Sequence, residues 1–143
     1  MNQLEIVTTA SPIVTNLLAT MAIASVLKET AYNINMELCQ EQGLKFCDIG
    51  EGPDLCELQT DEQNNAYYSA LLEREHDANP GLCDESFNPS AHYGHRVIIA
   101  ENNLIDAVAP LFDITRGHLG DMDNRKKFIT LIIQTVLSYK EGK

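Results

Sequence analysis

The 143-residue sequence lacks the short motifs that would identify a reaction. It has no P-loop, no GxGxxG dinucleotide-binding pattern and no GxSxG nucleophile turn. Its cysteines never form the C-x2-C pairs that zinc sites favour. It also has no tryptophan. From these absences we expect a protein that is not an enzyme and that carries no cofactor.

Charged residues are missing from Ile6 to Leu27, a pattern shared by membrane spans and signal peptides. Threonine, serine, asparagine and proline residues interrupt this run, which disfavours a membrane span. A signal peptide needs a basic start, whereas the chain opens MNQLE. We therefore expect a soluble protein, cytoplasmic or part of a particle or filament, although the sequence leaves its localisation open.

The length and the 44% content of hydrophobic residues are sufficient for one domain, residues 1–143, with its own core. Hydrophobic periodicity predicts an all-α fold, with about four helices in a bundle-like single domain and an acidic, loop-rich middle segment. The expected elements are a long apolar helix over about 11–42, an acidic cysteine-containing segment over about 43–90, and C-terminal helices over about 91–116 and 122–139.

The first helix is predicted to begin with Ser11 as its N-cap and Pro12 at the first helical position, and to end at Gly43. One face carries apolar residues every three or four positions, and a second apolar row widens this face as far as Val26. A chain of this size has difficulty covering such a helix, so we expect self-association. The candidate interface residues are Ile13, Leu17, Met21 and Leu27.

The other helices carry their own boundary signals. Thr60 and Gln63 form a possible capping box that opens a helix to about His76. Pro110 should bend or split the third helix, and the RVIIA stretch within it could instead be a short strand. The last helix is expected to open near Asp121 or Asp123.

Basic residues are scarce in the middle of the chain, where thirteen acids between Glu37 and Glu85 face only two bases. This segment accounts for the whole net charge of -11. It should repel phosphate, so no direct contact with nucleic acid is expected, and it could instead bind a basic protein. The candidate residues for such a partner are Asp48, Glu51, Asp54 and Glu57. The segment could also face the basic first turn of the last helix, Arg125 to Lys127, within one molecule or between copies.

All four cysteines, Cys39, Cys47, Cys56 and Cys83, fall within this acidic segment. They could form disulfides, most simply Cys47 with Cys56 across the Gly-Pro turn, which would leave Cys39 for Cys83. They could equally remain thiols. A metal site built from Cys83, His92 and His95 is a weaker alternative, because the spacing matches no established pattern.

Three hypotheses for the function follow. The first is a non-enzymatic assembly or structural protein, of the kind found in phage particles, filaments or rings, that forms homo-oligomers through its apolar helices. The second is an acidic inhibitor, immunity protein or chaperone-like protein that caps a basic protein surface. The third is a small metalloprotein or hydrolase that uses the cysteine and histidine residues.

Overall fold

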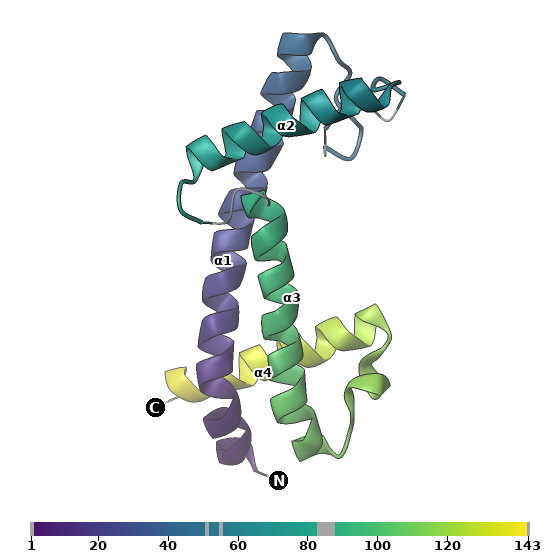
Figure 1. The fold of residues 1–143 in the computed structure, drawn as a ribbon. Coiled ribbons are helices and arrows are strands. Elements are labelled where there is room, and N and C mark those ends of the chain that lie inside the picture. Colours follow the sequence, from purple (N-terminus) through teal and green to yellow (C-terminus); the bar gives the residue numbers. More distant parts are fainter. Residues whose placement is uncertain (1, 51, 55, 83–87, 143) are drawn as a thin grey trace. The chain divides into compact units, whose positions relative to one another are not determined.

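The protein is all-α in the computed structural model, as the sequence predicts. The structure describes residues 2–50, 52–54, 56–82 and 88–142. Within them lie α1 (Gln3–Gln42), α2 (Asp61–Ala78), α3 (Pro89–Val108) and α4 (Met122–Glu141), together with the short 3-10 helices η1 (Ala109–Phe112) and η2 (Arg116–Leu119) (Figure 1). The described ranges contain no β-strand, only an isolated bridge between Phe46 and Pro53.

The helix α1 begins earlier than the sequence predicts. It starts at Gln3, where Asn2 Oδ1 accepts a hydrogen bond from Glu5 N at 2.8 Å, so the prediction of Ser11 as the N-cap is wrong. Pro12 therefore lies inside the helix, and the backbone bond that residue 12 would donate to Thr8 is missing. The predicted end is confirmed, because Gly43 follows α1 in a left-handed conformation with φ 67°.

The starts of α2, α3 and α4 agree with the sequence signals, but the helix predicted over about 91–116 ends at Val108. Thr60 and Gln63 form the predicted capping box at the start of α2. Residues 96–100 are helical, which rules out the strand alternative, and α3 ends at Val108 because Pro110 falls in the following 3-10 turn. Asp121 caps α4 by accepting a hydrogen bond from Asp123 N at 2.8 Å.

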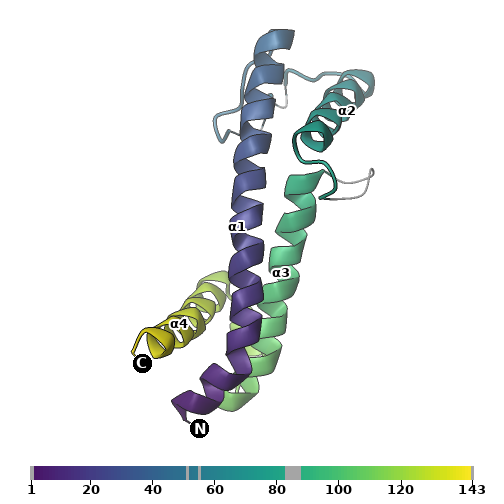
Figure 2. The same ribbon diagram turned by 90° about the vertical axis from the view of Figure 1, so that its left-hand side faces the viewer.

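The chain divides into two compact units, which we describe separately. Unit 1 comprises Met1–Met21 and His95–Lys143, and in it α4 crosses the first part of α1 and the last part of α3 (Figures 1 and 2). Its core takes residues from all three helices, from η1 and from η2: Ala10, Val14, Leu17, Ala100, Leu104, Ile105, Val108, Ala109, Leu119, Phe128, Ile129, Ile132 and Val136.

The basic first turn of α4 finds its acidic neighbour within unit 1. Arg125 donates to Asn102 Oδ1 at 2.7 Å and to Glu101 Oε1 at 3.5 Å, and both partners lie on α3. The expectation that the acidic middle segment could supply this partner is therefore wrong for Arg125, because Glu101 on α3 provides the carboxylate.

Unit 2 comprises Ala22–Gly94 and is held together by the second half of α1 packing on α2. Its core contains Ile34, Leu38 and Cys39 from α1 with Tyr67 and Leu71 from α2. The sequence places fourteen acids and three bases in unit 2, and seven of each in unit 1, so unit 2 carries the entire net charge. Much of this acidity lies on the helices themselves, and one pair joins them: Arg74 binds both carboxylate oxygens of Glu41, at 2.5 and 3.0 Å.

Candidate functional site

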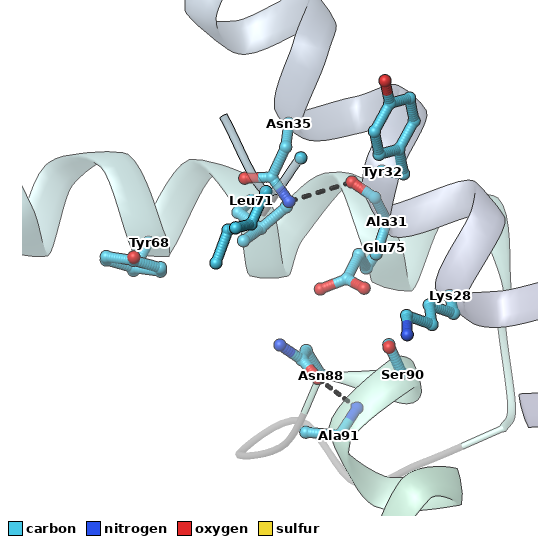
Figure 3. A pocket seen from close by; sticks show the side chains of 12 residues that line it. Lys28, Ala31, Tyr32, Asn35, Tyr68, Leu71, Glu75, Asn88, Ser90 and Ala91 are labelled. Atoms are coloured by element: carbon cyan, nitrogen blue, oxygen red, sulfur yellow. Dashed lines mark hydrogen bonds between the residues drawn. The ribbon is translucent and has the colours of Figure 1, made fainter. Parts of the chain in front are cut away.

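One cavity of unit 2 has a volume of about 380 Å³, within the range of small-molecule sites (Figure 3). It lies among the second half of α1, the loop that follows it, α2 and the start of α3. Two tyrosine side chains, four aliphatic ones and several polar groups line it: Lys28, Ala31, Tyr32, Asn35, Ile49, Gly50, Tyr68, Leu71, Glu75, Asn88, Ser90 and Ala91.

Glu75 is the unusual residue of this cavity. It is only 1% exposed, yet its Oε2 has no hydrogen-bond partner among the described residues. Burial raises the pKa of Glu75 to about 7, against a smaller lowering effect of the neighbouring His76. The carboxylate faces the cavity, as do Asn88, Ser90 and the amino group of Lys28 (Figure 3). Buried carboxylates are normally paired or hydrogen-bonded. Glu75 Oε2 is an exception, because it borders a cavity and has no partner among the described residues.

A hydrogen-bond chain fixes the helices behind the cavity. The Tyr67 hydroxyl donates to Asn35 Oδ1 at 2.7 Å, and Cys39 Sγ lies 3.6 Å from the same hydroxyl. The amide nitrogen of Asn35 in turn donates to the Ala31 carbonyl at 2.9 Å. Burial, and then the hydrogen bond with Cys39, raises the pKa of Tyr67, so it stays a neutral donor. This chain sets the position of Asn35 at the cavity wall.

The loop after α1 is held in a turn by its own backbone hydrogen bonds, and its glycines approach Tyr32 and Asn35. Cys47 N donates to Gly52 O at 2.6 Å, and Asp54 N donates to Lys45 O at 3.0 Å. Gly50 approaches the helix so closely that a Cβ atom there would stand 2.7 Å from Tyr32 Cε2, and its φ of 77° also favours glycine. The turn is therefore held by hydrogen bonds and a close glycine contact.

No disulfide joins any two of Cys39, Cys47 and Cys56, so the expected Cys47–Cys56 link is absent. The turn is instead held by the backbone hydrogen bonds from Cys47 N and Asp54 N, and Cys39 is buried beside Tyr67. Cys83, the proposed partner of Cys39 and a candidate metal ligand, lies outside the described residues. His92 and His95 both lie on α3, and no group of three His, Cys, Asp or Glu residues in the described ranges could hold a metal ion.

The acidic residues proposed to bind a basic partner differ in exposure. Asp48 is exposed, whereas Glu57 is half-buried. Asp54 is also half-buried, and its Oδ2 lies 3.7 Å from Lys45 Nζ. Glu51 lies outside the described residues. Asp48 is therefore the fully exposed member of this set within the part of the chain that the structure describes.

The row proposed as an oligomer interface faces largely inward. Leu17 and Leu27 are 0% and 2% exposed, and Ile13 packs against the unit 1 core, while Met21 remains 41% exposed. A different row of α1 is open: Ala19, Ala22, Ile23 and Val26 are all exposed, Val26 by 61%. We call these four residues the α1 seam. Three of them, Ala22, Ile23 and Val26, form one wall of a shallow apolar groove of about 280 Å³ that Asn79 and Leu82 border on its other side.

Glu75 was not among the site residues predicted from the sequence. The signal was present, because Tyr67, Leu71 and Glu75 follow at intervals of four residues and so share one helical face. An acid in line with two core residues indicates a carboxylate directed inward.

The chain matches no protein-family profile, and neither curated proteins nor solved structures gave a match. Among the described residues, α1 is long and apolar enough to cross a membrane by length and composition: its most apolar window has a mean hydropathy of 1.7, and 22% of it is buried. A helix with this composition can also be one that packs on protein.

Proposed function

We propose that this protein is a non-enzymatic assembly subunit that pairs with a second copy of itself through the α1 seam. The supporting observation is that the least polar stretch of the chain presents a row of exposed apolar side chains, on the far side of α1 from the buried Leu17. Exposed contiguous apolar rows on helices are typical of association surfaces.

The spacing of the seam suits a second copy of the same helix. Its residues stand at positions i, i+3, i+4 and i+7, the pattern by which helices pack along their length. In an antiparallel pair centred between Ala22 and Ile23, Ala19 would face Val26 of the other copy, and Ala22 would face Ile23. Each small side chain then meets a large one, which allows close packing across a two-fold axis.

A threonine lies on the same face of α1 beyond each end of the seam, and its hydroxyl is already hydrogen-bonded within the helix. Thr15 donates its hydroxyl to Ser11 O at 3.0 Å, and Thr30 donates to Val26 O at 3.0 Å. Because these hydroxyls are satisfied within the helix, burying them against a partner would leave no donor unpaired. No charged residue occurs from Ile6 to Leu27, so the four seam residues and the helix surface before them carry no charge.

The test is the oligomeric state of the full chain, measured by native mass spectrometry and light scattering at micromolar concentration. We expect a dimer or larger even-numbered oligomer for the wild type. Val26→Glu should yield a monomer, since it would bury a charge against Ala19 of the other copy within the seam. Ser25→Glu is the matched control: it adds the same charge at an adjacent exposed position outside the seam, and should leave the oligomer intact.

Three outcomes would overturn the proposal. A monomeric wild type would remove its basis. Dissociation by Ser25→Glu as well would indicate a general charge effect, and an intact Val26→Glu oligomer would place the contact elsewhere. Flotation of a monomeric wild type with phosphatidylcholine vesicles would assign the exposed row to a lipid surface instead.

A further inference from the structure

We propose that the cavity of unit 2 is a binding site for a small organic ammonium compound, whose positively charged nitrogen pairs with Glu75. This inference is independent of the α1 seam, because it rests on the cavity residues alone. It would give the protein a ligand-binding role in addition to self-association.

The carboxylate is the first argument. Glu75 Oε2 is buried, faces the cavity and has no hydrogen-bond partner among the described residues. No ion pair of Glu75 is formed there either, even though Lys28 lines the same cavity. A buried, unpaired acid is costly to keep, and a cationic ligand would supply both the missing hydrogen bond and the missing charge.

The rest of the wall suits an ammonium group with a short hydrocarbon part. A primary ammonium has three N–H donors, and the Ser90 hydroxyl is an acceptor on the same cavity as Glu75, whereas Asn88 Oδ1 already accepts from Ala91 N at 2.6 Å (Figure 3). The rings of Tyr32 and Tyr68 also line it, and aromatic faces attract cations. Ala31, Leu71 and Ile49 provide apolar surface for the carbon chain.

The net charge of unit 2, like the carboxylate of Glu75, favours a positively charged ligand. The sequence of unit 2 contains fourteen acids against three bases, so its field attracts cations and repels anions. Lys28 is the one base on the cavity wall, and its side chain is exposed to water, which screens its charge. A phosphate or carboxylate ligand would meet the buried Glu75 and is disfavoured.

The experiment uses n-butylammonium chloride as the probe and 1-butanol as its uncharged counterpart, with the full-length protein. Binding is followed by ligand-observed NMR and by titration of amide shifts at pH about 8.5, where Glu75 is ionised. We expect saturable millimolar binding of n-butylammonium and at least about tenfold weaker binding of 1-butanol. Glu75→Gln should weaken n-butylammonium binding about tenfold or more, because it keeps the shape of the side chain but removes its charge.

Glu73→Gln is the matched control, since it removes one charge from an exposed position on the same helix. It should bind n-butylammonium within about twofold of the wild type. Lowering the pH to about 5 should weaken binding by the wild type through protonation of Glu75. Both variants retain the other charged and titratable groups nearest to Glu75 in the cavity or the sequence, which are Lys28, Tyr32, Tyr68 and His76. These groups therefore contribute equally to the pH dependence of binding in both variants.

Each alternative result overturns the proposal. Equal binding by Glu75→Gln would show that the carboxylate does not recognise the cation. Equal binding of 1-butanol would show a merely apolar cavity, and equal weakening by Glu73→Gln would show attraction to the overall charge alone. No saturable binding at any concentration up to tens of millimolar would show that the cavity does not accept this class.

Discussion

Replacing Glu75 by glutamine should stabilise the protein at neutral and alkaline pH. The pKa of Glu75 is raised from 4.5 to about 7 in the folded protein, so the folded state holds a proton that the unfolded state has already released. The stability that depends on protonated Glu75 is complete below pH 4.5 and is lost as the pH rises through about 7. The glutamine variant has no such proton to lose.

The size of the effect follows from the two pKa values. Each unit of difference corresponds to about 1.4 kcal/mol, so the ionised carboxylate costs the folded state roughly 3 kcal/mol at full ionisation. At pH about 5.5 the cost is roughly 1 kcal/mol, and at pH about 8.5 it has reached nearly its full value of roughly 3 kcal/mol. The advantage of Glu75→Gln over the wild type should therefore grow by about 2 kcal/mol across this interval.

Urea unfolding followed by circular dichroism at several pH values measures this difference. The interval starts above the isoelectric point of about 4.6, where the protein has its lowest net charge. Glu73→Gln, which removes an exposed charge from the same helix, is the control and should not reproduce the growing advantage. The reasoning is refuted if Glu75→Gln is no more stable than the wild type at pH about 8.5, or if its advantage does not change with pH.

Two further substitutions test the contacts around the cavity. Tyr67→Phe removes the hydroxyl between Cys39 and Asn35 and should lower the free energy of unfolding by about 1 to 3 kcal/mol, whereas Tyr68→Phe, at an exposed neighbour, should have a small effect; similar losses from both would argue against the hydrogen-bond chain. Gly50→Ala should destabilise unit 2 by about 1 kcal/mol or more beyond Gly43→Ala. Both glycines have a positive φ, but of the two only position 50 would place a Cβ within 4 Å of a neighbour, Tyr32. Equal urea midpoints for the two variants would contradict the close contact.

Local signals predicted the helix boundaries well where the chemistry is local. The Thr60–Gln63 capping box, Gly43 and Pro110 act through neighbouring backbone groups, so the residues themselves define the boundary. Pro12 misled the prediction because a proline suits the first turn of a helix but is also tolerated inside one whose other bonds hold. Asn2 offered the alternative cap and was not considered.

Features that depend on tertiary packing were harder to predict. The inward direction of Leu17 and Leu27 depends on which elements pack on α1, and a nearly all-round apolar helix does not reveal which row is covered. The vacant acceptor of Glu75 follows from the residues of α1 and α3 around it, which sequence periodicity cannot place. Periodicity could have indicated that this acid points inward, but not that it borders a cavity.

The two units share two of their helices, since α1 and α3 both pass from one unit to the other. Each shared helix is a continuous ladder of backbone hydrogen bonds, so melting one half frays the ladder that the other half uses. Loss of either core thus weakens its neighbour through the main chain itself. Although unit 1 is neutral and unit 2 is acidic, we expect them to unfold together on heating, in a single cooperative transition.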